Sequence, residues 1–292
     1  MGKMLPMATD GLFAHCYRML GSVQDAQDAS RGTTGSERTS RYRAANNACL
    51  RLIRNRPRRM LPFDHGPACA DASDLGTPVT GPLWVEPAPD DLLGAGSESV
   101  ELPFVAALQH LPFPQRAVLS LCEEFSADET AEILDMTRAS VGSTLEAARA
   151  AVDHPERSQR EELRALGADG RRELVDALVT AWEKADVDGL LDLLTEDARF
   201  TMPPLPAWFD GRDRIRRFVS ERLFATPWRL VPIRANAQLA LACYQYVDHE
   251  FLLGAINLPH VRDGRISWLA GFVDPQLHQH FSIAQKFSRM DR

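Results

Sequence analysis

Residues 111–152 read LPFPQRAVLSLCEEFSADETAEILDMTRASVGSTLEAARAAV and contain two short helical patterns, one on each side of residues 135–137. Ser126 is a good N-cap for the first helix, and Glu129, three residues later, completes a capping box. Thr137 can cap the second helix. Two capped helices joined by a tight turn describe a helix-turn-helix, whose second helix enters the major groove when the motif binds DNA.

Apolar residues recur at helical spacing in both helices. They are Ala127, Ala131 and Leu134 in the first, and Val141, Leu145 and Ala148 in the second. A preceding helix, predicted over residues 115–123, offers an apolar face to hold the pair. A purely structural helical hairpin has the same pattern, so the spacing leaves both DNA binding and a structural role open.

The second helix offers four candidates for contact with DNA: Arg138, Ser140, Ser143 and Arg149. Glu146 stands on the same helix, although a surface that faces phosphates favours cations. Glu123 and Glu124 place further negative charge beside the motif. Because contacts with phosphates dominate the affinity for DNA, these carboxylates predict weak binding.

The bulk composition is that of an ordinary soluble protein with room for two or three domains. Of the 292 residues, 45% are hydrophobic and 25% are charged, and the formal net charge is −7. A chain this acidic is not a general nucleic-acid coat, so any DNA contact must come from a local patch. The five cysteines form no C-x-x-C pair, which predicts reduced thiols and no zinc site.

Neither a membrane partner nor secretion is expected. No apolar run reaches membrane-spanning length, and the N-terminus lacks the pattern of a signal peptide. We therefore expect a cytoplasmic protein.

The first hundred residues change character several times. Residues 11–29 form a helical pattern, and residues 30–40 (SRGTTGSERTS) have the composition of a turn. A basic cluster at the end of the next helix comprises Arg51, Arg54, Arg56, Arg58 and Arg59. This cluster is either a solvated helix end or a site of phosphate contact. Residues 61–99, rich in Pro, Gly, Asp and Ala, are typical of a linker, with Trp84 as its anchor.

The second half of the chain predicts an α+β domain. A charged helical connector over residues 153–170 leads to an amphipathic helix over residues 171–194. Five strand-like runs follow: ARFTMP, WRLVPIRANAQ, LALACYQYVD, EFLLGAINLPHV and GRISWLAGFVD. Asp263-Gly264 is a hairpin signal. Together these elements describe a curved antiparallel sheet wrapped around helices, a cone with an inner pocket.

The chain is therefore predicted to be multidomain, with an all-α N-terminal part that contains the helix-turn-helix and then an α+β cone. The predicted segments are a helical domain at 1–60, a linker at 61–99, a helix-turn-helix domain at 100–152, a connector at 153–170 and the cone at 171–285.

Several polar and aromatic residues of the cone are candidates for a ligand pocket. Strand alternation places Trp268, Phe272 and Asp274 on one face, and the other pocket candidates are Trp182, Met202, Trp208, Tyr246 and Asn257. Aromatic walls suit a small apolar metabolite. If the domain is an enzyme, Asp274 is the predicted general acid or base, Tyr244 would bind a developing oxyanion, and His249 is a further catalytic candidate.

A second interpretation gives Asp274 a structural role. It precedes Pro275, so it would cap the chain as it leaves the sheet. The cone shows neither a metal-binding cluster at a recognisable spacing nor a glycine-rich phosphate loop, so neither a metal nor a cofactor is expected.

The quoted motifs resemble a known family. LP-x-x-QRAVL, then S-A-x-E-x-A-E-x-L, then T-x-A-S-V are similar to the promoter −35-reading region of extracytoplasmic-function sigma factors. HCYRMLGSVQDAQDA resembles the start of their polymerase-binding region, and NRPRRMLP with LWVEPAPDDLL resembles the linker between the two regions. FTMPPLPAWFDGRDRI and WRLVPIRAN resemble an extra C-terminal domain of one actinobacterial-type subgroup, which is similar to SnoaL and ketosteroid isomerase.

This resemblance implies promoter DNA and the RNA polymerase core as partners. In the family, a long helix pair rich in apolar and aromatic residues clamps the polymerase and opens the −10 element. Here residues 30–40 interrupt that region with turn residues, and Ser40 and Arg41 stand where the family has bulky apolar side chains. The resemblance therefore implies a degenerate, weakened polymerase-binding region.

Two main kinds of function remain open from the sequence, beside a third, a ligand-binding regulator with no catalysis. The first is a protein of transcription initiation with a regulatory or ligand-sensing SnoaL-like domain. The second is a repurposed relative that acts as an enzyme of secondary metabolism, a cyclase, isomerase or hydrolase working by general acid/base catalysis in the cone pocket.

Overall fold

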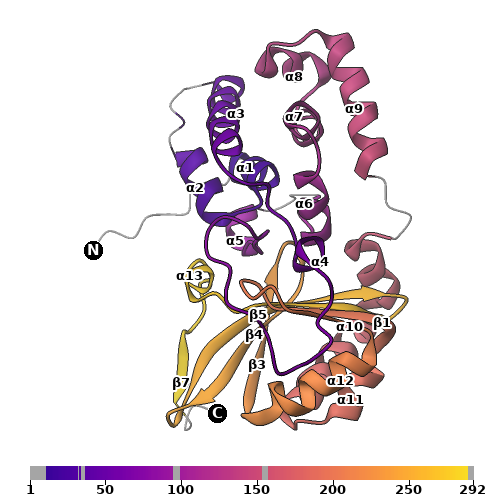
Figure 1. Ribbon diagram of the computed structural model, residues 1–292. Coiled ribbons are helices and arrows are strands. Elements are labelled where there is room, and N and C mark those ends of the chain that lie inside the picture. The colour runs from indigo at the N-terminus through magenta and orange to yellow at the C-terminus, as the bar shows by residue number, and fades with distance from the viewer. Residues whose placement is uncertain (1–10, 32, 34–36, 95–98, 153–156, 289–292) are drawn as a thin grey trace. The chain divides into compact units, whose positions relative to one another are not determined.

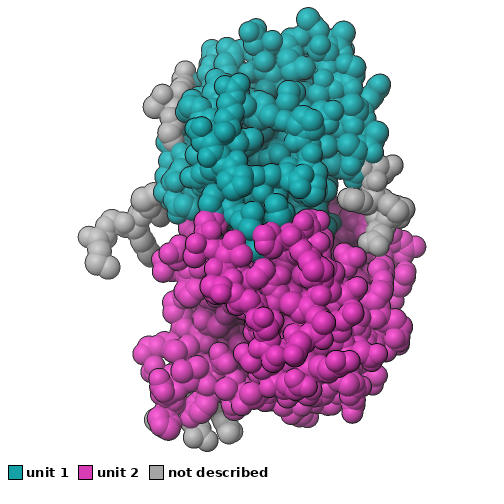
Figure 2. Space-filling view, viewed as in Figure 1, with its two compact units in different colours: residues 1–60, 82–155 teal, residues 61–81, 156–292 magenta. Residues whose placement is uncertain are grey.

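The computed structural model describes residues 11–31, 33, 37–94, 99–152 and 157–288. The chain divides into two compact units, coloured separately in Figure 2. The helical unit comprises residues 1–60 and 82–155, and the α+β unit comprises residues 61–81 and 156–292. The predicted sequence of an all-α part followed by an α+β part is confirmed.

The helical unit is built from short helices around a buried first helix. Every residue of that helix is buried, including the polar ones. The helices of this unit are α1 (Leu12–Leu20), α2 (Val23–Arg31), α3 (Arg38–Asn55), α5 (Asp90–Leu93), α6 (Leu102–Gln109), α7 (Phe113–Leu121), α8 (Ala127–Leu134) and α9 (Arg138–Val152).

The single helix predicted over residues 11–29 is two helices. Gly21 ends α1 in the left-handed conformation (φ 63°), and its N–H donates to the Tyr17 carbonyl at 2.7 Å. A residue without a Cβ adopts this conformation at little cost, so the chain turns here and α2 starts at Val23. None of the helices in the described ranges has the length and apolar composition that a membrane crossing requires.

The α+β unit pairs one large sheet with helices (Figure 1). Its helices are α4 (Pro62–His65), α10 (Gln159–Glu183), α11 (Val187–Asp192), α12 (Arg212–Glu221), the 3-10 turn η1 (Leu223–Ala225) and α13 (Pro275–His278). Its strands are β1 (Leu194–Thr201), β2 (Trp208–Asp210), β3 (Trp228–Ala235), β4 (Gln238–Val247), β5 (Glu250–Arg262), β6 (Arg265–Phe272) and β7 (Lys286–Ser288). The five predicted strand runs correspond to β1, β3, β4, β5 and β6.

The sheet has the order β2-β1-β6-β5-β4-β3, and β7 pairs with β5 outside this path. The β1–β6 pairing is parallel, which corrects the expectation of antiparallel strands throughout. The three hairpins from β3 to β6 turn at residues 236–237, 248–249 and 263–264, and all six turn residues have positive φ. Two such residues define the type I′ turn that matches the twist of the strands, so the Asp263-Gly264 signal predicted its hairpin.

One face of the sheet packs on α10, α11 and α12 and forms the core. Trp182 of α10, Leu190 of α11 and Phe218 of α12 meet Phe200, Leu241 and Leu269 of the strands in one buried cluster. Since side chains alternate along a strand, the neighbours of Leu269 point to the opposite face.

The predicted linker and connector are structured where they are described, which excludes residues 95–98 of the linker. Residues 61–81 belong to the α+β unit, whereas residues 82–93 belong to the helical unit, where Trp84 is buried and bridges Met60. In the predicted connector, residues 153–156 lie outside the described residues, and α10 begins at Gln159 and kinks at Gly167. The Gln159 amide exchanges two hydrogen bonds with the Val261 backbone, at 2.9 and 2.7 Å, and so fixes this helix to β5.

Candidate functional site

The helix-turn-helix forms as its sequence predicts. Ser126 Oγ accepts from the Glu129 N–H at 3.3 Å, and the Glu129 carboxylate accepts from the Ser126 N–H at 2.9 Å. Asp135 ends α8 in the left-handed conformation, and Thr137 Oγ1 then accepts from the Ser140 N–H at 3.1 Å to start α9. These contacts confirm the two capped helices and the tight turn between them.

The buried face agrees largely with the prediction for α9 but not with that for α8. Val141 and Ala148 are fully buried, as expected, whereas Leu145 is half-buried and packs against the cluster that contains Ala148. In α8, Thr130 and Ile133 are buried, whereas the predicted residues are only half-buried: Ala127, Ala131 and Leu134. The Thr130 hydroxyl lies against Cys122 Sγ at 3.7 Å, so a small polar residue takes an inner position that a hydrophobic pattern does not reveal.

The outer surface of α9 carries the predicted DNA-binding residues, and all four are exposed: Arg138, Ser140, Ser143 and Arg149. Successive residues turn by about 100°, so the side opposite Val141 and Ala148 is made of Ala139, Ser143, Glu146 and Ala150. Within α9, all of which the structure describes, this central strip has one carboxylate and no cation. Arg138 is further compensated by Asp128 at 3.1 Å.

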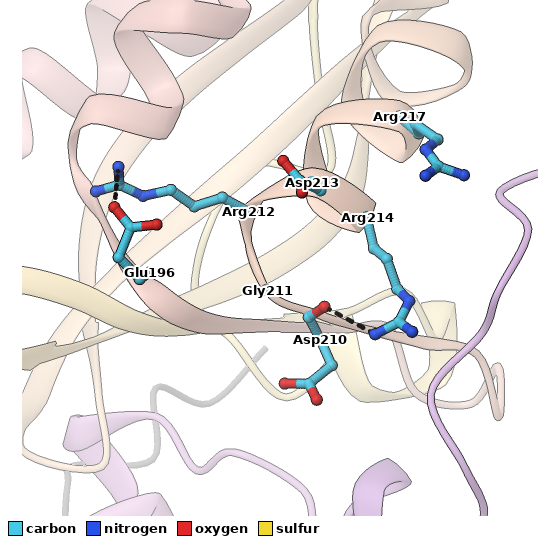
Figure 3. Close-up of a pocket in the computed structure, with 7 residues that line it drawn as sticks. All are labelled: Glu196, Asp210, Gly211, Arg212, Asp213, Arg214 and Arg217. Carbon is cyan, nitrogen blue, oxygen red and sulfur yellow. Dashed lines mark hydrogen bonds and ion pairs between the residues drawn. The ribbon is translucent and has the colours of Figure 1, made fainter.

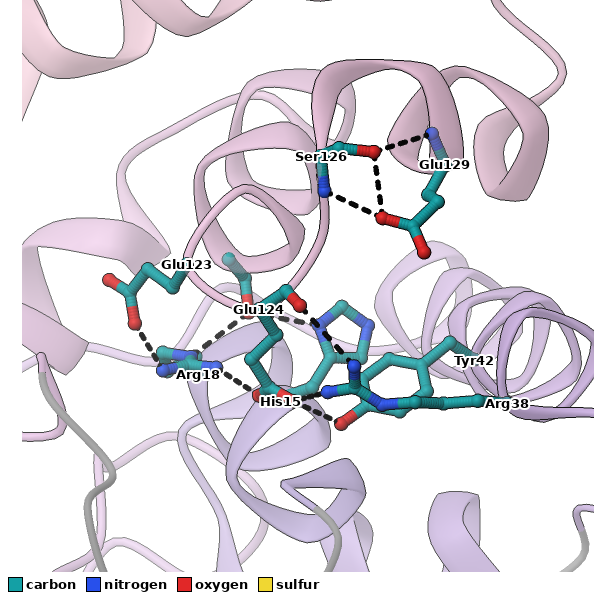
Figure 4. A network of polar contacts seen from close by, with 9 residues as sticks. His15, Arg18, Arg38, Tyr42, Glu123, Glu124, Ser126 and Glu129 are labelled. Carbon is teal, nitrogen blue, oxygen red and sulfur yellow. Dashed lines mark hydrogen bonds and ion pairs between the residues drawn. The ribbon is translucent and has the colours of Figure 1, made fainter.

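A buried charge network joins the helix-turn-helix to α1 and α3 inside the helical unit (Figure 4). Arg18 is 2% exposed and binds Glu123 at 2.5 Å, Glu124 at 3.0 Å and Ser120 Oγ at 3.0 Å. Glu124 also accepts from Arg38 at 2.9 Å and from the Tyr42 hydroxyl. We call Arg18, Arg38, Tyr42, Glu123 and Glu124 the Arg18 network.

The Arg18 network changes the interpretation of two acidic residues. Glu123 and Glu124 were expected to repel DNA, but their charges are neutralised by Arg18 and Arg38. The prediction of extra negative charge beside the motif is therefore wrong. Sequence reasoning missed the network because its partners lie more than 80 positions apart; the available signal was a charged residue in an otherwise apolar helix.

The environment of this network shifts two pKa values. Burial, then hydrogen bonding to Glu124, raises the pKa of Tyr42. Burial, then the neighbouring Arg18 charge, lowers the pKa of His15 to about 3. His15 is therefore neutral at pH 7, and its Nδ1 lies 2.9 Å from Ser120 Oγ.

Two members of the basic cluster at the end of α3, Arg56 and Arg59, form ion pairs, and Arg59 is buried. Asp25 binds both Arg56 and Arg59, and Arg59 is 7% exposed and also binds Glu86 at 3.0 Å. Hydrogen bonds and charge from these arginines lower the pKa of Asp25 against the opposing effect of its burial, which is the largest single contribution. The solvated interpretation is therefore wrong for Arg59.

In the α+β unit, the predicted pocket residues divide between the two faces of the sheet. Trp182 and Met202 belong to the core beneath the helices, and Asn257 pairs in register with the core residue Leu241. Trp268 alternates with the core residue Leu269 and points to the other face, where its indole donates to Thr201 Oγ1 at 2.9 Å. One common pocket face is therefore not formed.

The remaining pocket candidates lie apart from that core. Phe272 is buried on the Trp268 side by strand alternation. Tyr246 is half-buried and stacks on Phe251 at 5.1 Å. His260, which the sequence did not single out for the pocket, lies parallel to the Trp268 ring at 4.3 Å, and burial lowers its pKa to about 3.

Two of the three catalytic candidates have structural partners, and the third lies in an exposed turn. Asp274 is the N-cap of α13 and accepts from the Gln276 N–H at 2.9 Å, as the capping interpretation predicted. The Tyr244 hydroxyl donates to the Ala284 carbonyl at 2.8 Å, and burial raises its pKa. His249 is an exposed residue of the β4–β5 turn. Tyr244 alternates along β4 with the core residue Cys243, so it points to the face of the sheet away from the core.

A hollow of about 380 Å³ opens where β2 leads into α12 (Figure 3). Its charged side chains balance, three acidic and three basic: Glu196, Asp210, Asp213, Arg212, Arg214 and Arg217. Arg212 binds Glu196 at 2.8 Å, and Arg214 donates to the Asp210 carbonyl at 3.2 Å. This lining suits a polar ligand, not the small apolar metabolite predicted. Among the described residues, no group of three or more His, Cys, Asp or Glu is arranged to hold a metal ion.

Residues 61–81, which we call the strap, lie on the α+β unit. The Cys69 N–H donates to the Trp208 carbonyl at 2.8 Å, and the Trp208 indole donates to the Gly66 carbonyl at 2.9 Å. Further along, the Val79 N–H donates to the Pro204 carbonyl at 2.9 Å. Ala72 is buried in the core cluster.

An aromatic residue anchors the start of the strap. The Phe63 ring meets Trp208 edge-on at 6.1 Å and Trp268 edge-on at 5.5 Å. The Arg199 guanidinium lies 4.9 Å from the Phe63 ring centre. Edge-on aromatic pairs and a cation above a ring are both attractive, so Phe63 is held from several directions.

Comparisons with known proteins agree with this architecture. Residues 102–152 match the family "Sigma-70, region 4", and residues 175–269 match the family "SnoaL-like domain". The chain is 34% identical over 298 residues to the ECF RNA polymerase sigma factor SigG of Mycobacterium tuberculosis, in strains CDC 1551/Oshkosh and ATCC 25618/H37Rv, with 93% of this chain and 80% of the relative covered. The crystal structure of the extracytoplasmic-function sigma factor SigJ of M. tuberculosis shares the fold, with a TM-score of 0.58 and 20% identity over 94% of this chain and 96% of that chain.

Proposed function

This chain belongs to the extracytoplasmic-function (ECF) family of RNA polymerase sigma factors, and on that premise we propose that it acts in transcription initiation with RNA polymerase and promoter DNA as partners. The capped helix-turn-helix, with the outer face of α9 exposed, supports a −35-reading role for this motif. Because transcription takes place on the chromosome, we propose a cytoplasmic place of action.

We propose that the SnoaL-like unit regulates this activity through the strap. The position of the strap in the chain supports this proposal. Met60 and Pro82, which flank the strap in sequence, both belong to the helical unit. Binding or release of residues 61–81 by the α+β unit therefore changes the conformational freedom of the segment between α3 and α6, the two helices that flank the predicted linker. A small apolar ligand would act by taking the place of Phe63 on Trp208 and Trp268.

The enzyme alternative receives no support from the geometry. Asp274 is engaged as an N-cap, Tyr244 is bound to a carbonyl and His249 lies in an exposed turn. A general acid or base must reach a bound substrate, and these side chains are not gathered around one pocket.

The polymerase-binding region remains the weak part of the proposed activity. Within the interrupting stretch, residues 32 and 34–36 lie outside the described residues; α2 ends at Arg31 and α3 begins at Arg38. The apolar residues that α1 offers are all buried within the helical unit. We therefore propose weak association with core polymerase, because interfaces depend on a few accessible apolar and aromatic anchors.

The test is transcription with purified core polymerase on pooled genomic promoter fragments. The full-length protein is compared with Phe63→Ala, and with Thr77→Ala as a control for an exposed strap residue. Promoter-specific transcripts from the full-length protein, with a yield changed by Phe63→Ala and unchanged by Thr77→Ala, are expected. Absence of specific transcripts and of polymerase binding would overturn the transcription proposal. Equal transcription by all three proteins would overturn the role of the strap alone.

A further inference from the structure

A cleft of about 490 Å³ opens in the helical unit between the end of α3 and the α6–α7 corner. Its apolar walls come from Leu52, Ile53 and Phe113. Its charged lining consists of Arg56, Arg58, Arg59, Arg116 and a single acid, Asp25. A volume of this size is in the range of small-molecule sites, about 300–1,000 Å³.

The charges that line this cleft do not cancel. Four arginines and one aspartate leave an excess of three positive charges in the lining, in a chain whose net charge is −7. Asp25 is already shared by Arg56 and Arg59, and Arg59 also binds Glu86. The positive charge that remains uncompensated therefore belongs to Arg58 and Arg116.

Arg116 forms the buried floor of the cleft. It is 5% exposed, and its terminal nitrogens donate to the carbonyls of Met19 at 2.6 Å, Gln109 at 2.9 Å and Leu111 at 3.1 Å. Carbonyls satisfy donors without neutralising a cation, and Nε has no partner in the described residues. Burial lowers the pKa of Arg116 to about 10.

Arg58 lies above this floor and is exposed. In the part of the chain that the structure describes, it forms no ion pair, and its charge also acts on Arg116. Two neighbouring guanidinium groups without a carboxylate repel one another, and an anion placed between them relieves this repulsion.

We infer that this cleft binds a small phosphorylated ligand, with its phosphate on Arg58 above the Arg116 floor and its apolar or aromatic body against Leu52, Ile53 and Phe113. Arginine matches phosphate with paired, charge-assisted hydrogen bonds. A flat ring can pack on Phe113. The bounded volume and apolar walls favour a free metabolite over a nucleic-acid backbone, which is contacted mainly by accessible cations along an exposed surface.

The inference is independent of transcription, because it is tested by binding to the full-length protein alone. Isothermal titration at low salt uses adenosine 5′-monophosphate, uridine 5′-monophosphate, adenosine and inorganic phosphate as probes. At least one nucleotide should bind saturably with one site per chain, and more tightly than adenosine or phosphate, since each of these supplies only half of the contacts.

The matched variants are Arg58→Ala and Arg54→Ala. Both side chains are exposed arginines near the end of α3, but Arg54 does not line the cleft. Loss of a charge-assisted contact should weaken nucleotide binding about tenfold or more in Arg58→Ala, with less than about a twofold effect in Arg54→Ala. Phe113→Ala should weaken the nucleotide but not inorganic phosphate.

Three results would overturn the inference. The first is that no nucleotide binds saturably. The second is an equal loss of nucleotide affinity in the Arg54 and Arg58 variants. The third is complete displacement of the nucleotide by duplex DNA, with the same dependence on Arg54 as on Arg58. The last two results would show diffuse attraction of phosphates to the end of α3.

Discussion

Replacing Arg18 with Met should destabilise the helical unit strongly, although the change keeps most of the apolar stem. Arg18 is 2% exposed and loses its contacts with Glu123, Glu124 and Ser120. The methionine fills the space in α1 without supplying a charge. In the Arg18→Met variant, two carboxylates remain on the α7–α8 corner. Glu124 keeps its contacts with Arg38 and Tyr42, whereas Glu123 loses its ion pair with Arg18.

The expected loss follows from burial. Removing one partner of a buried ion pair costs about 3–5 kcal/mol, because the other charge is left uncompensated. Glu123 and Glu124 are 23% and 17% exposed, so water can reach them in part and the lower end applies. We expect a loss of about 3 kcal/mol in the free energy of unfolding. With a urea slope of about 2 kcal/mol/M, the midpoint should fall by roughly 1.5 M.

The assay is urea unfolding followed by far-UV circular dichroism, with Arg43→Met as the matched control. Arg43 also joins α3 to α8 through Glu132 at 3.8 Å, but its side chain and that of Glu132 are 48% and 62% exposed. An exposed pair contributes about 0–1 kcal/mol, so this control should barely move the midpoint. Equal, small losses in both variants would refute the reasoning that burial makes the Arg18 network important.

Three further predictions follow from the same structure. Below pH 6.5 the unfolded chain protonates His15 and His260, whereas the folded chain, in which burial lowers both pKa values to about 3, does not. As the pH drops, the free energy of unfolding should therefore fall by up to ~1.4 kcal/mol per pH unit for each of these histidines, and His278, whose pKa burial also lowers, contributes in the same direction. His15→Gln should remove only the contribution of His15 from the loss measured by urea unfolding between pH 7 and 5. Glu146→Lys places a cation on the central strip of α9 and should tighten promoter binding in gel shifts, with a salt dependence steeper by about one phosphate contact; an unchanged affinity would argue against a DNA-facing α9. Phe63→Ala should make proteolytic cleavage within residues 61–81 about tenfold faster through loss of its aromatic contacts, whereas Thr77→Ala should not; equal rates would show that Phe63 does not anchor the strap.

Elements that depend on neighbouring residues could be predicted from the amino-acid sequence. The capping box at Ser126 and Glu129 formed as predicted, because its partners lie three positions apart. The five strand runs and the Asp263-Gly264 hairpin also formed, because alternation and turn chemistry act over a few residues. The same local rule identified Asp274 as a cap before Pro275.

Contacts between residues far apart in the sequence became apparent only from the folded chain. The composition of residues 61–99 predicted a linker, but the structure divides this segment between the two units. Its first part packs on the α+β unit through contacts of Phe63 with Trp208 and Trp268, more than 140 positions away. Likewise, the negative charge of Glu124 looked unfavourable until its partner Arg18, 106 positions earlier, was placed beside it. The register between strands separated the predicted pocket residues: Asn257 lies opposite the core residue Leu241, whereas Trp268 alternates with the core residue Leu269 and takes the other face. The physical reason is that side chains alternate with a period of two, so the register decides which face each one occupies.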